Sequence, residues 1–111
     1  MSPRRGEVWS ADLGLAAKVR PIIILSRDDP DPPRKITVYV PLTTQNRGSK
    51  YEVELPRLSF LTQGSAANLQ GIASGATEDE TLFLRKLGDL PASAMTKVEN
   101  ALLYTVGIQI G

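Results

Sequence analysis

The chain has 111 residues, of which 41% are hydrophobic and 23% charged, and it contains neither cysteine nor histidine. This length predicts a single compact domain spanning residues 1–111, without room for a second catalytic domain. The missing cysteines exclude disulfides, thiolate zinc sites and a cysteine nucleophile. The missing histidines remove the usual general base and any Ser-His-Asp triad.

Positive charge is concentrated in the first half of the chain. The 13 lysines and arginines nearly balance the 12 acidic residues overall, but residues 1–50 hold nine of the basic groups and five of the acidic ones. This distribution suits a phosphate-binding face, although a small domain also reaches such an imbalance by chance. No apolar run approaches the roughly 18 to 20 residues of a membrane span, and residues 1–6 lack the apolar stretch of a signal peptide. We therefore expect a cytoplasmic protein that does not contact membranes.

The first half of the chain predicts three strands. Residues 6–13 alternate apolar and polar side chains, which is typical of a half-buried strand. The β-branched run at 20–26 is typical of a strand that is buried on both faces. The charged, proline-rich segment 27–33 predicts an exposed connection. A third strand is expected over 35–42, with Pro41 marking its end or an unpaired edge.

The second half begins with a turn and gives a weaker strand signal. Residues 43–49 have the composition of a turn, and alternation resumes at 51–55. The pattern then fades until residue 76, with a candidate short strand at 69–72. A last strand is expected at 81–87.

One amphipathic helix is expected from about residue 91 to residue 106. A proline opens this segment, where the first turn of a helix accepts it, and apolar residues follow at helical spacing. Five or six short strands with one C-terminal helix predict a mainly β fold, a small barrel whose open side the helix covers.

Two polar segments lie where predicted strands begin or end. Lys18 and Arg20 stand at the start of the most apolar strand, and an arginine there can bind two oxygens of a phosphate. Thr43, Thr44 and Gln45 follow the third strand and can donate hydrogen bonds to a phosphate or a base edge. Both segments also have a plain structural interpretation, as a solvated charge and as turn-forming residues.

The ordered set of motifs resembles the MazF/PemK family of toxins from type II toxin-antitoxin systems. The matching segments are GEVW at 6–9, RPIIILS at 20–26, VPLTT at 40–44 and LRKLG at 84–88, followed by the C-terminal helix. Each segment alone is weak evidence, but their order over nearly the whole chain is fairly specific.

The resemblance implies a homodimer of SH3-like barrels that cleaves single-stranded RNA without a metal or other cofactor. It also implies a cognate antitoxin protein that neutralises the toxin. The catalytic residues of the family fall on Arg20 and Thr43. RNA can be cut by attack of its own 2′-hydroxyl on the neighbouring phosphate, so the site needs no protein nucleophile. Arg20 would stabilise the charge of the transition state, and Thr43 would donate to a nonbridging oxygen.

Further residues are expected to contact RNA around this pair. They are polar or basic groups in the loops at the strand ends, namely Lys18, Thr44, Gln45, Arg47, Lys50 and Gln70. For the loop that follows the threonine pair, a solvated hairpin turn is the alternative interpretation. Trp9 could stack on a base, but we expect it in the core because it shares a strand face with Ala11 and Leu13.

The first loop departs from the family pattern. Many members carry a Glu-Gln-Xaa-Gly segment before the Arg-Pro pair, whereas residues 13–19 of this chain contain Lys18 as their only charge. Two alternatives stay open: a gyrase-poisoning toxin of the CcdB type, which shares the fold, and a non-catalytic RNA- or protein-binding barrel. Arg20 and Thr43 favour the nuclease, because a gyrase binder needs no phosphate clamp.

Overall fold

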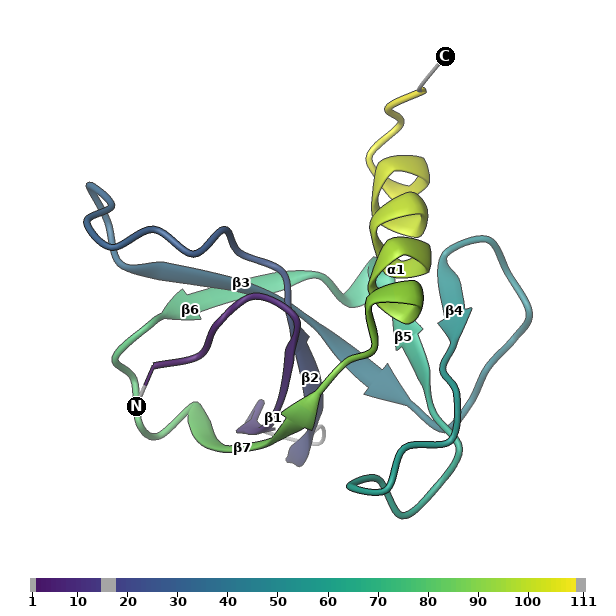
Figure 1. Cartoon of the computed structure of the whole chain (residues 1–111), viewed down its shortest axis with the longest axis horizontal. Coiled ribbons are helices and arrows are strands. Elements are labelled where there is room, and N and C mark those ends of the chain that lie inside the picture. The colour runs from purple at the N-terminus through teal and green to yellow at the C-terminus, as the bar shows by residue number, and fades with distance from the viewer. Residues whose placement is uncertain (1, 15–17, 110–111) are drawn as a thin grey trace.

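The computed structural model describes residues 2–14 and 18–109 (Figure 1). These residues form seven strands, one short 3-10 helix and one α-helix, joined by turns and loops, and the mainly β prediction is confirmed. In chain order the elements are β1 (Glu7–Asp12), β2 (Val19–Ile24), β3 (Ile36–Thr43), β4 (Glu52–Glu54), β5 (Ala66–Asn68), η2 (Leu69–Gly71), β6 (Ala73–Ala76), β7 (Phe83–Asp89) and α1 (Ala92–Thr105).

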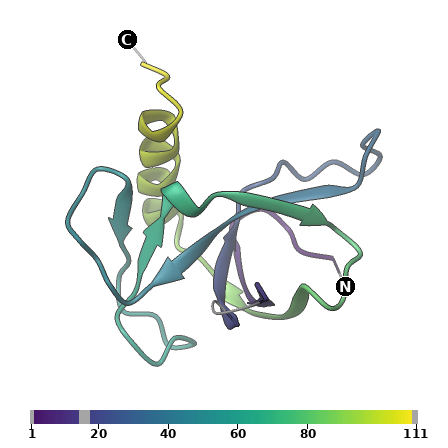
Figure 2. The ribbon, with the colours of Figure 1, turned by 180° about the vertical axis from the view of Figure 1, so that it is seen from behind.

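All strand pairs are antiparallel, and β3 links the two parts of the sheet. The strand order is β4-β5-β3-β2-β1-β7, and β6 also pairs with β3. The first half of β3 pairs with β6 through Ile36 to Tyr39, and its end pairs with β5 through Leu42 and Thr43. Figures 1 and 2 show β3 running from one part of the sheet to the other, with α1 standing on the β4 and β5 side.

Apolar side chains are buried on both faces of β2. Ile22 and Ile24 belong to one hydrophobic cluster, together with Trp9, and Ile23 and Leu25 belong to the other. All four are at most 5% exposed. The interpretation of residues 20–26 as a strand buried on both faces is therefore confirmed for its central residues.

The helix covers the larger cluster with a face of small and medium side chains. Ala94, Val98 and Ala101 are its buried residues, and Val98 is fully inaccessible to solvent. The helix begins at Ala92, directly after Pro91, and ends at Thr105, within one residue of the predicted bounds. Its spacing of small residues allows close approach to η2 and β4.

The predicted strand at 69–72 is wrong. Residues Leu69–Gly71 form the 3-10 turn η2 between β5 and β6. The pairing of β3 changes there, from Tyr39 opposite Ala73 to Leu42 opposite Ala67, so η2 takes up three extra residues. β3 continues past Pro41 to Thr43, and Pro41 lies where this edge of β3 passes from β6 to β5.

The carboxylate of Glu7 links the start of β1 to β7. It accepts hydrogen bonds from Arg4 N at 2.8 Å and from the indole Nε1 of Trp9 at 2.9 Å, and it lies 3.0 Å from Lys86 Nζ. Trp9 is 3% exposed, so its expected place in the core is confirmed. The GEVW segment is thus explained by packing and hydrogen bonding within the fold.

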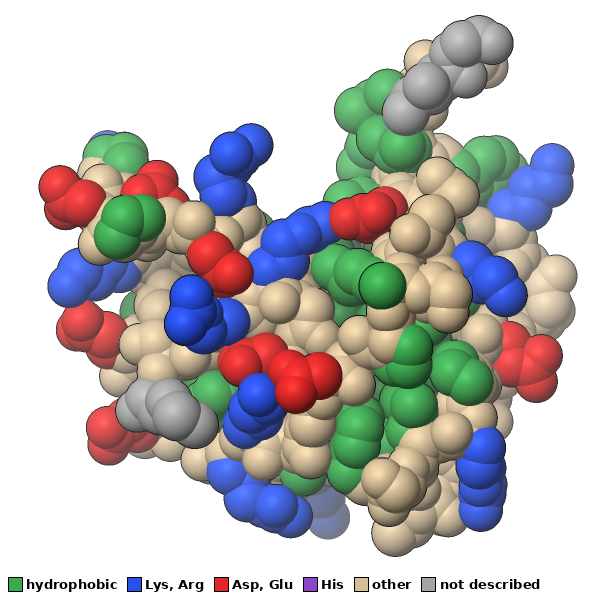
Figure 3. Space-filling view, viewed as in Figure 1, with side chains coloured by type: hydrophobic (Ala, Val, Ile, Leu, Met, Phe, Trp, Pro, Cys, Tyr) green, Lys and Arg blue, Asp and Glu red, His purple; other side chains and the backbone are tan. Residues whose placement is uncertain are grey.

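Charged side chains of both signs are interspersed on the face seen in Figure 3. The excess of basic residues in the first half of the sequence therefore does not form a uniformly positive surface on this face. No helix in the described ranges is long and apolar enough to cross a membrane.

Candidate active site

A cleft of about 440 Å³ opens where β2 begins and β3 ends. Its walls come from three parts of the chain: the start of β2, the end of β3 with the loop after it, and the loop between β4 and β5, with one residue added by β7. The lining residues are Val19, Arg20, Pro21, Leu42, Thr43, Thr44, Gln45, Phe60, Leu61, Thr62, Gln63, Ser65 and Leu87.

The register of β2 against β3 brings Arg20 and Thr43 to the same cleft. The last pair of the ladder is Ile22 opposite Pro41. Arg20 and Thr43 each lie two residues beyond this pair. Because the two strands run in opposite directions, both residues lie at the same end of the β2–β3 pair. Two residues 23 positions apart in sequence thereby line one site.

Arg20 provides the charge of the cleft. It is the only charged residue among the described lining residues, and no carboxylate joins it there. Its Nε is buried and has no hydrogen-bond partner in the described part of the chain. An unneutralised guanidinium in a partly enclosed cleft favours an anionic ligand, and its planar fork matches the geometry of a phosphate.

The Thr43 side chain is oriented by the turn that follows it. Its Oγ1 accepts a hydrogen bond from the backbone N of Gln45 at 3.0 Å. A hydroxyl that accepts in this way can still donate its own proton. Arg20 and Thr43 thus place a guanidinium and a hydroxyl proton in one cleft, and both are donors that phosphate oxygens can accept.

The structure gathers some of the predicted RNA-contacting residues and not others. Thr44 and Gln45 line the cleft beside Thr43. The remaining four, Lys18, Arg47, Lys50 and Gln70, are exposed and lie outside the cleft lining.

Local contacts account for the positions of three of these four residues. The backbone of Lys18, at a φ of 51°, closes the β1–β2 hairpin by hydrogen bonds to Leu13 and Gly14. In this first loop, which differs from the family pattern, residues 15–17 lie outside the described residues. Lys50 places its Nζ 5.6 Å from the ring centre of Tyr104 on α1. Arg47 donates its backbone N to Glu52.

Hydrogen bonds also hold the loop between β3 and β4 in shape. Ser49 Oγ donates to Glu52 at 2.8 Å. This bond, followed by the one from the backbone of Arg47, lowers the pKa of the Glu52 carboxyl below its ordinary value. The acidic group therefore stays ionised as the anchor of the loop that carries Arg47 and Lys50.

Sequence reasoning missed the contribution of residues 60–65. Five residues of this segment line the cleft, and none of them was predicted as a site residue. The segment lies in the region where the strand pattern fades. Its polar run Thr62, Gln63 and Ser65 after two apolar residues is the signal that could have indicated an exposed, site-forming loop.

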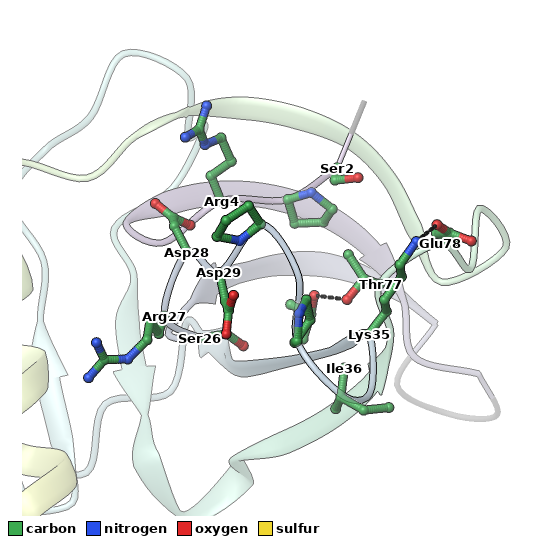
Figure 4. A pocket seen from close by; sticks show the side chains of 14 residues that line it. Ser2, Arg4, Ser26, Arg27, Asp28, Asp29, Lys35, Ile36, Thr77 and Glu78 are labelled. Atoms are coloured by element: carbon green, nitrogen blue, oxygen red, sulfur yellow. Dashed lines mark hydrogen bonds and ion pairs between the residues drawn. The ribbon is translucent and has the colours of Figure 1, made fainter.

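A larger cavity, of about 690 Å³, lies apart from this cleft and holds none of the predicted site residues. It is formed by the N-terminal segment, the loop between β2 and β3, and the turn after β6 (Figure 4). Two pairs of its polar side chains bind one another: Lys35 pairs with Glu78 at 3.1 Å, and Thr37 and Thr77 share a hydrogen bond of 2.9 Å. Across the described ranges, no three carboxylates come together to form a metal site.

Comparison with known proteins identifies the family. The model of the PemK-like, MazF-like toxins of type II toxin-antitoxin systems matches residues 4–106. The chain belongs to this family. A probable endoribonuclease of Mycobacterium tuberculosis, MazF5, is 33% identical over 105 residues, which cover 94% of this chain and 93% of the relative.

Solved structures agree with this toxin over nearly all of its length. A mycobacterial endoribonuclease in complex with its cognate antitoxin has a TM-score of 0.80 and 27% identity, covering 98% of this toxin and 99% of the other chain. MazF in a MazE-MazF structure from Deinococcus radiodurans, at 19% identity, has a TM-score of 0.77 over 98% and 99% of the two chains and supports the fold. The family of endoribonucleases is thus favoured over the gyrase-poisoning and non-catalytic alternatives.

Proposed function

We propose that this toxin cleaves single-stranded RNA in the cleft that contains Arg20 and Thr43. The observation that carries this assignment is the guanidinium of Arg20, which stands in a cleft without a lining carboxylate. Thr43 lines the same cleft, from the neighbouring strand. A phosphodiester brings the negative charge that the cleft lacks.

The substrate supplies its own nucleophile in this mechanism. The 2′-oxygen of a ribose attacks the neighbouring phosphorus and forms a P–O2′ bond, while the P–O5′ bond breaks. The 2′-hydroxyl loses its proton to water, and the departing 5′-oxygen gains one. The products are a 2′,3′-cyclic phosphate and a 5′-hydroxyl, so no water is consumed and no protein side chain forms a covalent bond.

The two side chains stabilise the pentacoordinate phosphorus. Arg20 stays charged in neutral solution and binds the nonbridging oxygens, on which negative charge increases in the transition state. The Thr43 hydroxyl donates to one of the same oxygens while the backbone of Gln45 fixes its orientation. Such prearranged donors lower the barrier because they need no reorganisation during the reaction.

The test is to incubate the purified protein with a long single-stranded RNA in the presence of EDTA. We expect discrete fragments whose 5′ ends are free hydroxyls and whose 3′ ends are cyclic phosphates. Arg20→Ala should reduce the rate by about 10²- to 10³-fold, the usual effect of removing one transition-state donor. Its melting temperature should stay close to that of the wild type, because the guanidinium forms no ion pair within the described residues.

Two results would contradict the proposal. Cleavage that stops when EDTA is added would show that the reaction depends on a metal ion. Cleavage that persists unchanged in Arg20→Ala would place the chemistry elsewhere. Mapping the 5′ ends also reports the sequence that the toxin recognises.

The biological setting follows the family. The toxin acts in the cytoplasm, where its RNA substrate and its antitoxin are made, and the antitoxin blocks the same cleft with an acidic or apolar segment. Two copies form a homodimer, so that each RNA meets a larger surface than one 111-residue chain offers.

A further inference from the structure

The ring of Phe60 forms a wall of the cleft, and nothing in the catalytic mechanism uses it. It comes from the loop between β4 and β5, is partly exposed, and lines the same cleft as Arg20 and Thr43. Its inner part packs against the larger hydrophobic cluster. The ring is therefore fixed on one side and open to the cleft on the other.

Gly88 on β7 makes room for this ring. A Cβ atom built at Gly88 would lie 2.3 to 2.9 Å from three atoms of the Phe60 ring, well inside contact distance. The ring thus rests directly on the backbone of β7. The backbone angles of Gly88 do not themselves require glycine, since its φ is not among the positive values. The position of the ring thus leaves no room for a larger side chain at residue 88.

A β-bulge in β7 supports the same arrangement. Val8 of β1 pairs with Gly88 and Trp9 pairs with Lys86, so Leu87 is the extra residue between two ladder pairs. Bulges change the direction in which a side chain points, and they recur beside functional sites. Leu87 lines the same cleft as Phe60. β7 therefore contributes both the support for the ring and an apolar lining residue.

We propose that Phe60 stacks on a base of the RNA next to the cleaved phosphate and thereby helps to determine where the toxin cuts. This inference rests on the proposed function. Single-stranded RNA exposes unstacked bases, and aromatic rings in binding grooves stack on them. A rigid, half-open ring beside a phosphate-binding arginine provides such a surface at low entropic cost. Phe60 is a binding and positioning residue in this scheme and takes no part in the chemical step.

The experiment measures RNA binding separately from cleavage. The probe is a fluorescein-labelled pool of random-sequence, single-stranded RNA with 2′-fluoro riboses, which cannot undergo attack by the 2′-oxygen. Fluorescence anisotropy gives the Kd of each full-length variant. Phe60→Leu, which keeps the apolar contact but removes the ring, should weaken binding about tenfold, as the loss of one base stack typically does. Phe60→Tyr should bind RNA as tightly as the wild type, because it retains the aromatic ring.

Gly88→Ala tests the support of the ring without changing Phe60. The added Cβ should displace the ring and weaken binding several-fold, whereas Gly64→Ala, a substitution in open space in the same loop as Phe60, should have no effect. In a Phe60→Ala background, Gly88→Ala should cause no further loss of binding.

Cleavage of natural RNA gives a second test. There, Phe60→Leu should also relax the base preference at one position beside the cut, a change that a purely structural role would not produce.

The outcomes separate this inference from the proposed function. If the wild type binds the pool and Phe60→Leu binds equally well, the stacking role is overturned and the nuclease assignment stands. If the wild type neither binds the pool nor cleaves natural RNA, both are overturned. Thermal melting of each variant shows that it is folded, and Phe60→Met, with a similar apolar volume, replaces Phe60→Leu if leucine lowers the melting temperature.

Discussion

The role proposed for the Thr43 hydroxyl can be isolated by one substitution. Valine has nearly the same shape as threonine but cannot donate a hydrogen bond. Thr43→Val should therefore reduce the single-turnover cleavage rate by about 10²- to 10³-fold, while Thr43→Ser should retain most of the activity. The bond from Gln45 N is also lost in the valine variant, which should lower stability by only about 1 kcal/mol. A valine variant that cleaves within about threefold of the wild type would remove Thr43 from the mechanism.

Glu7 and Asp89 both contact Lys86, yet their contributions to stability should differ. The two carboxylates raise the pKa of the Lys86 ammonium above its ordinary value, and the hydrogen bond to Asp89 has the larger effect. Glu7 also holds the buried indole of Trp9, so Glu7→Ala leaves a buried donor without a partner. We expect a loss of about 1–3 kcal/mol in the free energy of unfolding for Glu7→Ala. Asp89→Ala, at a side chain 76% exposed, should change it by less than about 1 kcal/mol.

Urea denaturation of the two variants checks this difference. The comparison is matched because each substitution removes one carboxylate from the same ammonium. Equal effects would mean that the ion pair with Lys86 determines the stability, and that the hydrogen bond to Trp9 contributes little.

The candidate site could be predicted from sequence only where its residues lie on recognisable strands. Arg20 and Thr43 lie at strand ends in family motifs, and the antiparallel register then brings them together. Phe60 and Leu87 could not be placed in this way. Phe60 reaches the cleft from a loop without periodicity, and the exposure of Leu87 to the cleft depends on a bulge that no local residue pattern indicates.

At the scale of the elements, η2 is the part of the fold that the sequence predicted least well. Its neighbours β5 and β6 are short and consist of alanine, serine, glycine and asparagine, which are poor strand formers. They become strands because one edge of β3 is available for pairing, with β6 before Pro41 and with β5 after it. The long apolar strands β1, β2 and β3 were predicted correctly, since burial and alternation reinforce one another along them.

Gly71 in η2 allows a close approach to Pro41, and its replacement should destabilise the fold. A Cβ atom at Gly71 would lie 2.7 Å from Cγ of Pro41. Because the proline ring has little freedom to move, Gly71→Ala should lower the free energy of unfolding by about 1–3 kcal/mol. Gly64→Ala, which meets no atom within 4 Å, is the matched control and should change it by less than about 0.5 kcal/mol. A Gly71→Ala variant as stable as the control in urea would show that β3 shifts easily at this point.

At the scale of the whole molecule, the charge distribution predicts a weak dependence of RNA binding on salt. The net charge is +1, and basic and acidic side chains are mixed on the face seen in Figure 3. Long-range attraction to a polyanion is therefore small, and the charge within the cleft comes from Arg20. Each phosphate neutralised on a single strand contributes about −0.7 to the slope of log K against log salt concentration.

We therefore expect a slope of about −0.7 to −1.4 for the wild type, the share of one or two phosphate contacts, measured by anisotropy with the 2′-fluoro RNA pool. Arg20→Ala should make it shallower by about 0.7, the share of one phosphate contact. Lys50→Met tests whether the exposed loop cations add to binding, since its Nζ lies over the Tyr104 ring and outside the cleft lining. A slope steeper than about −4 would mean that RNA extends from the cleft over a broad basic surface. In that case Lys50→Met would flatten the slope as much as Arg20→Ala, because each phosphate contact contributes equally wherever it lies.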